Sequence, residues 1–461
     1  MKTASSGGGF SFVLGVTQIK LCGRMESVIR MCYTIKKEPP RYVGEKMETT
    51  ANLFLTILKA ALQGQRIEPD REILADEWEK LFKMAGIHNV LPMFFEAVYA
   101  SKSMQQSNLS FLPAVKRQVR QQVMMQALRT GEFLALNQSL QAAGIRPLVV
   151  KGIICRNLYP QPDYRQSGDE DVLIPEEQYA ACHQVLLDFG MHTTTEETQR
   201  ATSYEVPYRK AGSSLYIELH KQLFPPESDA YGDMNRFFAG VFRRAIPETI
   251  QGNIVYTLAP GDHLFYLICH AFKHFLHSGF GIRQVCDIVL YANAYGREVD
   301  WMDVLDRCRE LNADKFAAAL FRIGSNYLVF DMEKAGYPDA WRQIRVDETP
   351  MLADLLSAGV YGGADMSRKH SSSITLDAVA AQKRGRKARH AALTSAFPPA
   401  SQLSGRYPYL KKAPWLLPAA WASRLLHYFK ETRGSDNNNA AEALKIGSER
   451  IELMKEYGIL K

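Results

Sequence analysis

The sequence predicts an α+β protein in which a small mixed sheet lies between N-terminal helices and a C-terminal helical domain. Apolar residues recur at three- and four-residue spacing from about residue 51 to 143 and again beyond Pro260, as on one face of a helix. The intervening stretch has short apolar or alternating runs divided by glycines and polar turns, which indicates strands. A chain of 461 residues, 46% of them hydrophobic, can bury a sizeable core and is long enough for two packed domains.

The first 46 residues differ from those that follow. They include a run of Ser and Gly at 5–9, show no sustained periodicity and carry a net charge of +5. Their basic residues follow the apolar stretch, which is the reverse of the order in a signal peptide. We therefore expect a disordered or dispensable extension, with the amphipathic pattern of the folded protein beginning at Met47.

Each strand and helix is predicted from a local pattern. Residues 147–150 are wholly apolar, as in a buried strand, and follow a helix that ends at Gly144. A turn at 210–213 makes the two strands beside it an antiparallel pair. Strands are expected at 147–150, 169–174, 204–209 and 215–220, and helices at 114–143, 153–159, 175–188, 263–275, 282–294, after Asp300 and at 440–457.

These patterns divide the chain into six parts. They are the extension (1–46), an N-terminal helical region (47–144), the sheet-containing core (145–258), a helical domain (259–362), a basic loop-rich segment (363–412) and C-terminal helices (413–461).

The net charge of +7 is unevenly distributed. Residues 1–46 contribute +5 and residues 368–412 contribute +9, which leaves −7 for the rest of the chain. A nucleic-acid-binding protein more often spreads basic residues over its folded core, so the charge makes no strong case for nucleic acid. Seven cysteines without CxxC spacing indicate a reducing compartment, and we expect a cytoplasmic location.

No apolar run approaches the length of a bilayer span. The best candidate, 413–429, is interrupted by Pro414 and Pro418, so we expect no transmembrane segment. The basic stretch leaves peripheral membrane contact through 368–429 open, although a packed amphipathic helix is the favoured interpretation of its last part.

Asp169 and Asp171 form the most informative pattern. Alternate residues of a strand share a face, so these carboxylates project together while Glu170 points away. Two close carboxylates repel each other unless a cation lies between them, and oxygen ligands of this kind suit Mg²⁺. Alone, the Asp-x-Asp pattern is equally compatible with an exposed pair that binds nothing.

Other residues support a site near this pair. Gly152 opens a helix after the first strand, where backbone N–H groups can approach a phosphate. Glu218 alternates with Tyr216 and His220 on a later strand and places a third carboxylate on a sheet face. A solvated strand residue is the alternative for Glu218, and for His220 we favour a hydrogen-bonded polar neighbour over a metal ligand.

Two further pairs lie four residues apart on predicted helices. His270 and His274, beside Lys273, have a spacing that suits zinc, but the glutamate of a His-Glu-x-x-His motif is absent. We favour structural or phosphate-facing roles for them. Arg283 and Asp287 are interpreted as a helix surface pair.

Several short motifs occur in a defined order along the chain. They are Leu148-Val-Val-Lys151-Gly152, Leu158-Tyr159-Pro160, Arg165, Gly168-Asp169-x-Asp171-x-Leu-Ile174 and Ile217-Glu218-Leu-His220. Together they resemble the uncharacterised bacterial nucleotidyltransferase family of the polymerase-beta-like superfamily, over about residues 120–320.

The resemblance implies a nucleotidyltransferase core. Asp169, Asp171 and Glu218 would be the catalytic residues and would hold Mg²⁺ or Mn²⁺. Lys151 and Gly152 take the place of a phosphate-gripping Gly-Ser pair. Arg165, like Lys151, is a candidate for binding triphosphate charge.

The implied reaction is attack by an acceptor hydroxyl on the α-phosphate of a nucleoside triphosphate such as ATP, with Glu218 as base. The acceptor, whether small molecule, peptide or protein, is not indicated. The chain departs from the family pattern at Lys151-Gly152 and at Glu170, which stands where an apolar residue is usual and predicts a less buried far face of the strand. Two alternatives stay open, a decayed nucleotide-binding or regulatory module and a membrane-surface accessory protein in envelope-polymer or peptide biosynthesis.

Overall fold

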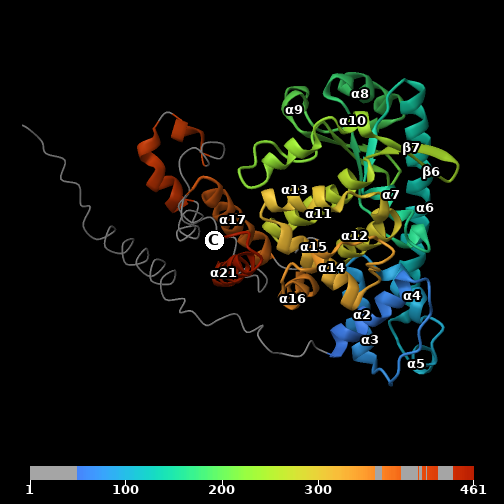
Figure 1. Ribbon diagram of the computed structural model, residues 1–461. Helices are drawn as coiled ribbons and strands as arrows, with labels where there is room; N and C mark the ends of the chain where they lie inside the picture. The colour runs from blue at the N-terminus through green and yellow to red at the C-terminus, as the bar shows by residue number, and fades with distance from the viewer. Residues whose placement is uncertain (1–48, 359–365, 386–402, 404–406, 412, 424–439) are drawn as a thin grey trace, which may run out of the picture.

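The computed structural model describes residues 49–358, 366–385, 403, 407–411, 413–423 and 440–461 (Figure 1). The expected extension at 1–46 lies outside these residues, as does much of the basic segment. Within the described part, the protein is a mixed α+β structure, as predicted, with a five-stranded sheet, a two-stranded hairpin and many flanking helices.

The five-stranded sheet contains the four predicted strands. Its order is β1-β2-β5-β4-β3, where β2 and β5 are parallel and the other neighbours are antiparallel. The strands are β1 (Leu148–Val150), β2 (Glu170–Leu173), β3 (Met191–His192), β4 (Glu205–Lys210) and β5 (Tyr216–His220). The parallel pairing aligns Asp171 with Glu218 and Leu173 with His220. Paired residues on neighbouring strands share a face, so this register decides which polar side chains meet.

The N-terminal helices lie at one end of the molecule and the sheet at the other, with the long helix α6 along one side (Figure 1). These helices are α2 (Thr49–Leu62), α3 (Ala75–Ile87), α4 (Leu91–Val98), α5 (Lys102–Gln106) and α6 (Leu112–Ala142). Short helices α7 (Gly152–Arg156), α8 (Tyr179–Asp188), α9 (Glu197–Thr202) and α10 (Val241–Arg244) connect or flank the strands.

The second helical region begins with α11 (Pro260–His277), whose first residue is a proline, as favoured at a helix start. It continues with α12 (Ile282–Tyr295), α13 (Trp301–Glu310), α14 (Asp314–Tyr327), α15 (Asp339–Arg342) and α16 (Thr349–Ala358). The predicted cap of α13 is confirmed, because the Asp300 carboxylate accepts the N–H groups of Met302 and Asp303 at 3.1 and 3.0 Å.

Two features differ from expectation. The segment 363–412 was expected to be loop-rich, but it contains the helix α17 (Met366–Lys383), which packs against the C-terminal helix α21 (Ala440–Glu456) and against α11. A hairpin of β6 (Ile246–Ile250) and β7 (Asn253–Thr257) was missed, although Gln251-Gly252 between two alternating runs is a hairpin signal.

One apolar core joins most of these elements. It runs from Phe54 in α2 through the sheet to Leu460 after α21. The five described cysteines are free and buried. No helix in the described ranges is long and apolar enough to cross a membrane.

Candidate active site

Lys151 lies at the junction between β1 and α7 in an uncommon backbone conformation. Its φ is 62° and its ψ is −115°, a region that non-glycine residues rarely occupy. Its N–H donates to His263 Nε2 at 3.1 Å, and His263 Nδ1 lies 3.2 Å from Thr257 Oγ1. The Thr257 hydroxyl donates to the Val149 carbonyl at 2.6 Å. This hydrogen-bonded chain fixes the backbone from which the Lys151 side chain extends.

Gly152 makes room for Glu170 beneath the first turn of α7. A Cβ atom at Gly152 would lie 2.0 Å from Glu170 Oε2. Glu170 is completely buried, accepts the Ile153 N–H at 2.9 Å and pairs with Arg156 Nη1 at 2.6 Å. The expectation that Glu170 marks a less buried face is therefore wrong, because a helix N–H and a guanidinium satisfy the carboxylate inside the core. The Ile153 N–H, expected to approach a phosphate, is engaged by Glu170.

The carboxylates of the neighbouring strands β2 and β5 meet on the opposite face of the sheet. One ligand atom from each of Asp171, Glu218 and His220 lies within 4.8 Å of the other two. His220 Nε2 is 3.3 Å from Asp171 Oδ1 and 3.8 Å from Glu218 Oε2. The structure thus brings Asp171 and Glu218 together, although 46 residues separate them in sequence. It also places His220, for which the sequence favours a polar-neighbour role over a ligand role, inside the cluster.

Asp169 lies just before β2, half-buried, and is not part of this group of three. Its charge nevertheless acts on Glu218. Burial is the main cause that raises the pKa of Glu218, a hydrogen bond from His220 opposes it, and the charges of Asp171 and Asp169 add to it. Glu205 of β4, paired with His220 across the sheet, places a further carboxylate oxygen 3.7 Å from His220 Nδ1.

Two cationic groups contact Asp171. The Lys151 ammonium lies 2.7 Å from Asp171 Oδ2, and the His220 ring lies beside Oδ1. Burial disfavours a charged His220, but the hydrogen bonds with Asp171 and Glu218 and the charges of Asp171 and Glu205 outweigh burial and raise its pKa to about 9. For Asp171 burial also opposes ionisation, and Lys151 and His220 together hold its pKa well below the usual range.

Helix α11 carries polar residues toward the same cluster. Lys151 Nζ is 3.3 Å from His270 Nε2, which in turn is 3.3 Å from His274 Nε2. Burial, followed by the Lys151 charge, lowers the pKa of Lys273, while Glu205, Asp171 and Glu218 act in the opposite direction. These groups were not included in the predicted site, and the only signal for them was the polar spacing on an otherwise apolar helix.

Arg165 is not at this cluster. Its guanidinium is buried and binds Asp287 of α12 through two contacts, Nε–Oδ1 at 3.0 Å and Nη2–Oδ2 at 2.6 Å. The Tyr159 hydroxyl donates to the same carboxylate at 2.8 Å. The expectation that Arg165 binds triphosphate is therefore replaced by a structural ion pair. The interpretation of Arg283 and Asp287 as a surface pair is also wrong, since both are buried.

The donor set of Asp171, Glu218 and His220 fits a divalent cation. Carboxylate oxygens suit Mg²⁺, and an imidazole with carboxylates suits Mn²⁺ as well. Both His220 ring nitrogens are buried and face the carboxylate oxygens of Asp171, Glu205 and Glu218 at distances of 3.3 to 3.8 Å. A cation would require His220 to give up a proton and Lys151 to move from Asp171, so its binding should release protons.

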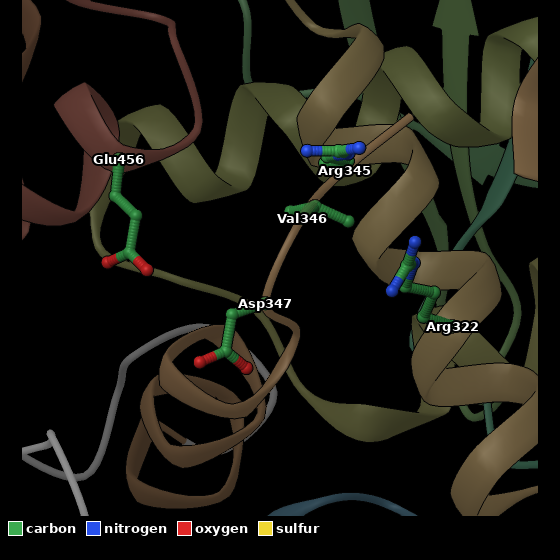
Figure 2. A pocket seen from close by; sticks show the side chains of 5 residues that line it. All are labelled: Arg322, Arg345, Val346, Asp347 and Glu456. Carbon is green, nitrogen blue, oxygen red and sulfur yellow. The ribbon is translucent and has the colours of Figure 1, made fainter. Parts of the chain in front are cut away.

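A separate hollow of about 440 Å³ lies between the end of α21 and the segment after α15. Arg322 and Arg345 line one side and Asp347 and Glu456 the other (Figure 2). It includes none of the predicted site residues.

The mixed sheet, with its acid cluster on two parallel strands, is the core of a nucleotidyltransferase-type protein. The chain belongs to the family described as uncharacterised nucleotidyltransferases, which matches residues 75–328, more than half of its length. Comparison with curated proteins found no significant match.

Among solved structures, the chain is similar to an antigenic nucleotidyltransferase-like protein from Paracoccidioides brasiliensis. The identity is 14%, and the match covers 45% of this chain and 95% of that chain with a TM-score of 0.28.

Proposed function

We propose that this protein transfers a nucleoside monophosphate from a nucleoside triphosphate to a hydroxyl-bearing acceptor, by the chemistry of the polymerase-beta-like superfamily. The observation that supports it best is the alignment of Asp171 with Glu218 on parallel strands, with His220 beside them. Family membership supports the same reaction class.

Each residue has a distinct part in the proposed reaction. Asp171 and Glu218, with Asp169 and His220 close by, would hold a divalent cation, which would neutralise negative charge on the triphosphate. Lys151 contributes a second positive charge at the same point. Glu218 accepts the proton of the acceptor hydroxyl, and its raised pKa makes the ionised carboxylate a better base.

The proposed transfer exchanges one phosphorus–oxygen bond for another. The acceptor oxygen forms a bond to the α-phosphorus, and the bond from that phosphorus to the bridging oxygen breaks. The leaving pyrophosphate carries the bridging oxygen, and the acceptor proton passes to Glu218. The products are a phosphodiester and pyrophosphate.

The test uses the full chain with Mn²⁺ or Mg²⁺, a cell extract as the source of acceptors, and ATP labelled on either the α- or the γ-phosphate. We expect the α-label alone to appear on the acceptor while the γ-label leaves in pyrophosphate, and we expect Asp171→Asn to abolish transfer of the α-label. Transfer of only the γ-label would mean phosphoryl transfer and would contradict the proposal. Metal-dependent binding without any transfer would favour the second candidate, a nucleotide-binding module whose catalysis has decayed.

A further inference from the structure

Helix α11 has a polar stripe on its otherwise apolar surface. Tyr266, His270, His274 and His277 follow one another at spacings of three or four residues, and Lys273 is three residues after His270, which places all five along one side of the helix. Most of the other α11 residues are apolar and buried. Contacts of His270 with Lys151 show that the stripe faces the carboxylates of β2 and β5.

Lys273 is the unpaired member of this stripe. Within the described ranges no carboxylate lies within ion-pair distance of its ammonium, although it is half-buried. The charges of Glu205, Asp171 and Glu218 reach it, as does the repulsion from Lys151. A partly buried ammonium without a paired carboxylate lowers the stability of the ligand-free protein. A bound anion would offset this loss of stability.

Three nitrogen-bearing side chains extend this cation toward the sheet. Lys151 Nζ, His270 Nε2 and His274 Nε2 follow one another at 3.3 Å separations, and the two imidazole rings lie 4.6 Å apart. The result is a nitrogen cluster, formed by Lys273, His270 and His274 of α11 with Lys151 after β1. It lies opposite a carboxylate cluster on β2 and β5.

These two clusters match two parts of a nucleoside triphosphate. The carboxylate cluster suits a cation at the α-phosphate, and the nitrogen cluster suits the negative charges of the phosphates beyond it. We propose that Lys273, with His270 and His274, binds the β- and γ-phosphates of the nucleoside triphosphate and the pyrophosphate that leaves. This inference rests on the proposed function and adds the binding site of the leaving group.

Equilibrium binding of inorganic tripolyphosphate, ATP and AMP, each with Mn²⁺, tests the inference on the full chain. Lys273→Met should weaken ATP and tripolyphosphate roughly 10- to 100-fold, the usual effect of losing a hydrogen bond to a charged group. AMP binding should be unchanged, because AMP has no β- or γ-phosphate. Lys273→Arg should retain most of the affinity. Lys80→Met, at an exposed lysine of α3, is the matched control and should behave like the wild type.

Mn²⁺ binding, measured by electron paramagnetic resonance, distinguishes a failure of the phosphate subsite from a failure of the proposed function. If wild-type protein binds Mn²⁺ and ATP but Lys273→Met binds tripolyphosphate as tightly as wild type, the phosphate subsite is wrong and the proposed function stands. If wild-type protein binds neither Mn²⁺ nor ATP, both are wrong. Should Lys273→Met fail to fold, His270→Gln replaces it, with the same expected loss of tripolyphosphate affinity and the same contrary result.

Discussion

At the scale of single residues, the site depends on which face of a strand a carboxylate occupies. Asp171 and Glu218 face α11, whereas Glu170 faces the opposite way and is buried with Arg156. A shift of one residue in the β2–β5 pairing would exchange these roles. The two carboxylates of β2 therefore have opposite functions, one at the proposed site and one inside the core.

Glu218→Gln tests the proposed base. The variant keeps the size of the side chain and removes its ability to take a proton, while Asp171 still binds cation and nucleotide. We expect nucleotide affinity to stay within a few-fold of wild type and transfer to fall by about 10²- to 10⁴-fold, the usual contribution of a positioned base. Single-turnover rates and equilibrium binding measure the two effects separately. A variant with wild-type transfer rates would assign the base to another group.

Gly152→Ala tests the close approach of Glu170. The new methyl group would overlap Glu170 Oε2, so the carboxylate must move from the Ile153 N–H and from Arg156. We expect a loss of roughly 1–3 kcal/mol in the free energy of unfolding, or more. Gly131→Ala is the control, since Gly131 lies in α6 with nothing within 4 Å of its added Cβ. That change should stabilise by about 0.5–1 kcal/mol. Equal effects in urea unfolding would refute the packing argument.

At the scale of elements, α12 holds the loop that leads into β2. Arg165 and the neighbouring backbone lie just before the site, and Asp287 anchors them through its two contacts with the guanidinium. Arg283 of the same helix donates to the Gln166 carbonyl. The charged residues are evident in the sequence but their partners are not, because residues more than a hundred positions apart meet only after folding.

Arg165→Met distinguishes an ion pair from a phosphate ligand. Without the guanidinium, Asp287 would stay buried with the Tyr159 hydroxyl as its hydrogen-bond donor but without its ion-pair partner, a loss that costs about 3–5 kcal/mol. We expect a large fall in the free energy of unfolding, and partial recovery in the double variant Arg165→Met, Asp287→Leu. Chemical denaturation of both variants provides the measurement. Unchanged stability with weakened ATP binding would restore the original interpretation of Arg165.

At the scale of the whole molecule, the core is continuous across the proposed segments. The N-terminal helices, the sheet and the C-terminal helices contribute to one apolar cluster. Asp354 of α16 joins α17 and α21 by ion pairs with Arg368 at 2.6 Å and Arg450 at 3.0 Å. The boundaries at 144 and 258 therefore stay a proposal about sequence organisation, and we expect the described parts to unfold together.

Acid should destabilise this core through its neutral histidines. Burial lowers the pKa of His88 to about 4 and of His263 to about 3, whereas both titrate near 6.5 when unfolded. Below pH 6.5 the unfolded chain thus binds more protons than the folded protein. The stability that the two neutral histidines contribute is complete above pH 6.5 and is lost as the pH falls toward 4. Between its two pKa values, each histidine should add roughly 1.4 kcal/mol per pH unit to the slope of the free energy of unfolding against pH. Urea unfolding between pH 7 and 4 measures the slope, and His88→Leu should reduce it by about one histidine's share. An identical slope in that variant would show that His88 is charged when folded.

The sequence by itself determined the fold class, four of the strands and the principal helices, because apolar periodicity depends only on neighbouring residues. Alternation along β2 and β5 likewise determined which carboxylates share a face on each strand. Only the tertiary structure decided that β5 lies parallel to β2 with Asp171 beside Glu218, that Arg165 belongs to Asp287, and that α11 directs Lys273 and His270 toward the acids. Strand pairing and helix packing are set by the whole core, so no local pattern encodes these partners.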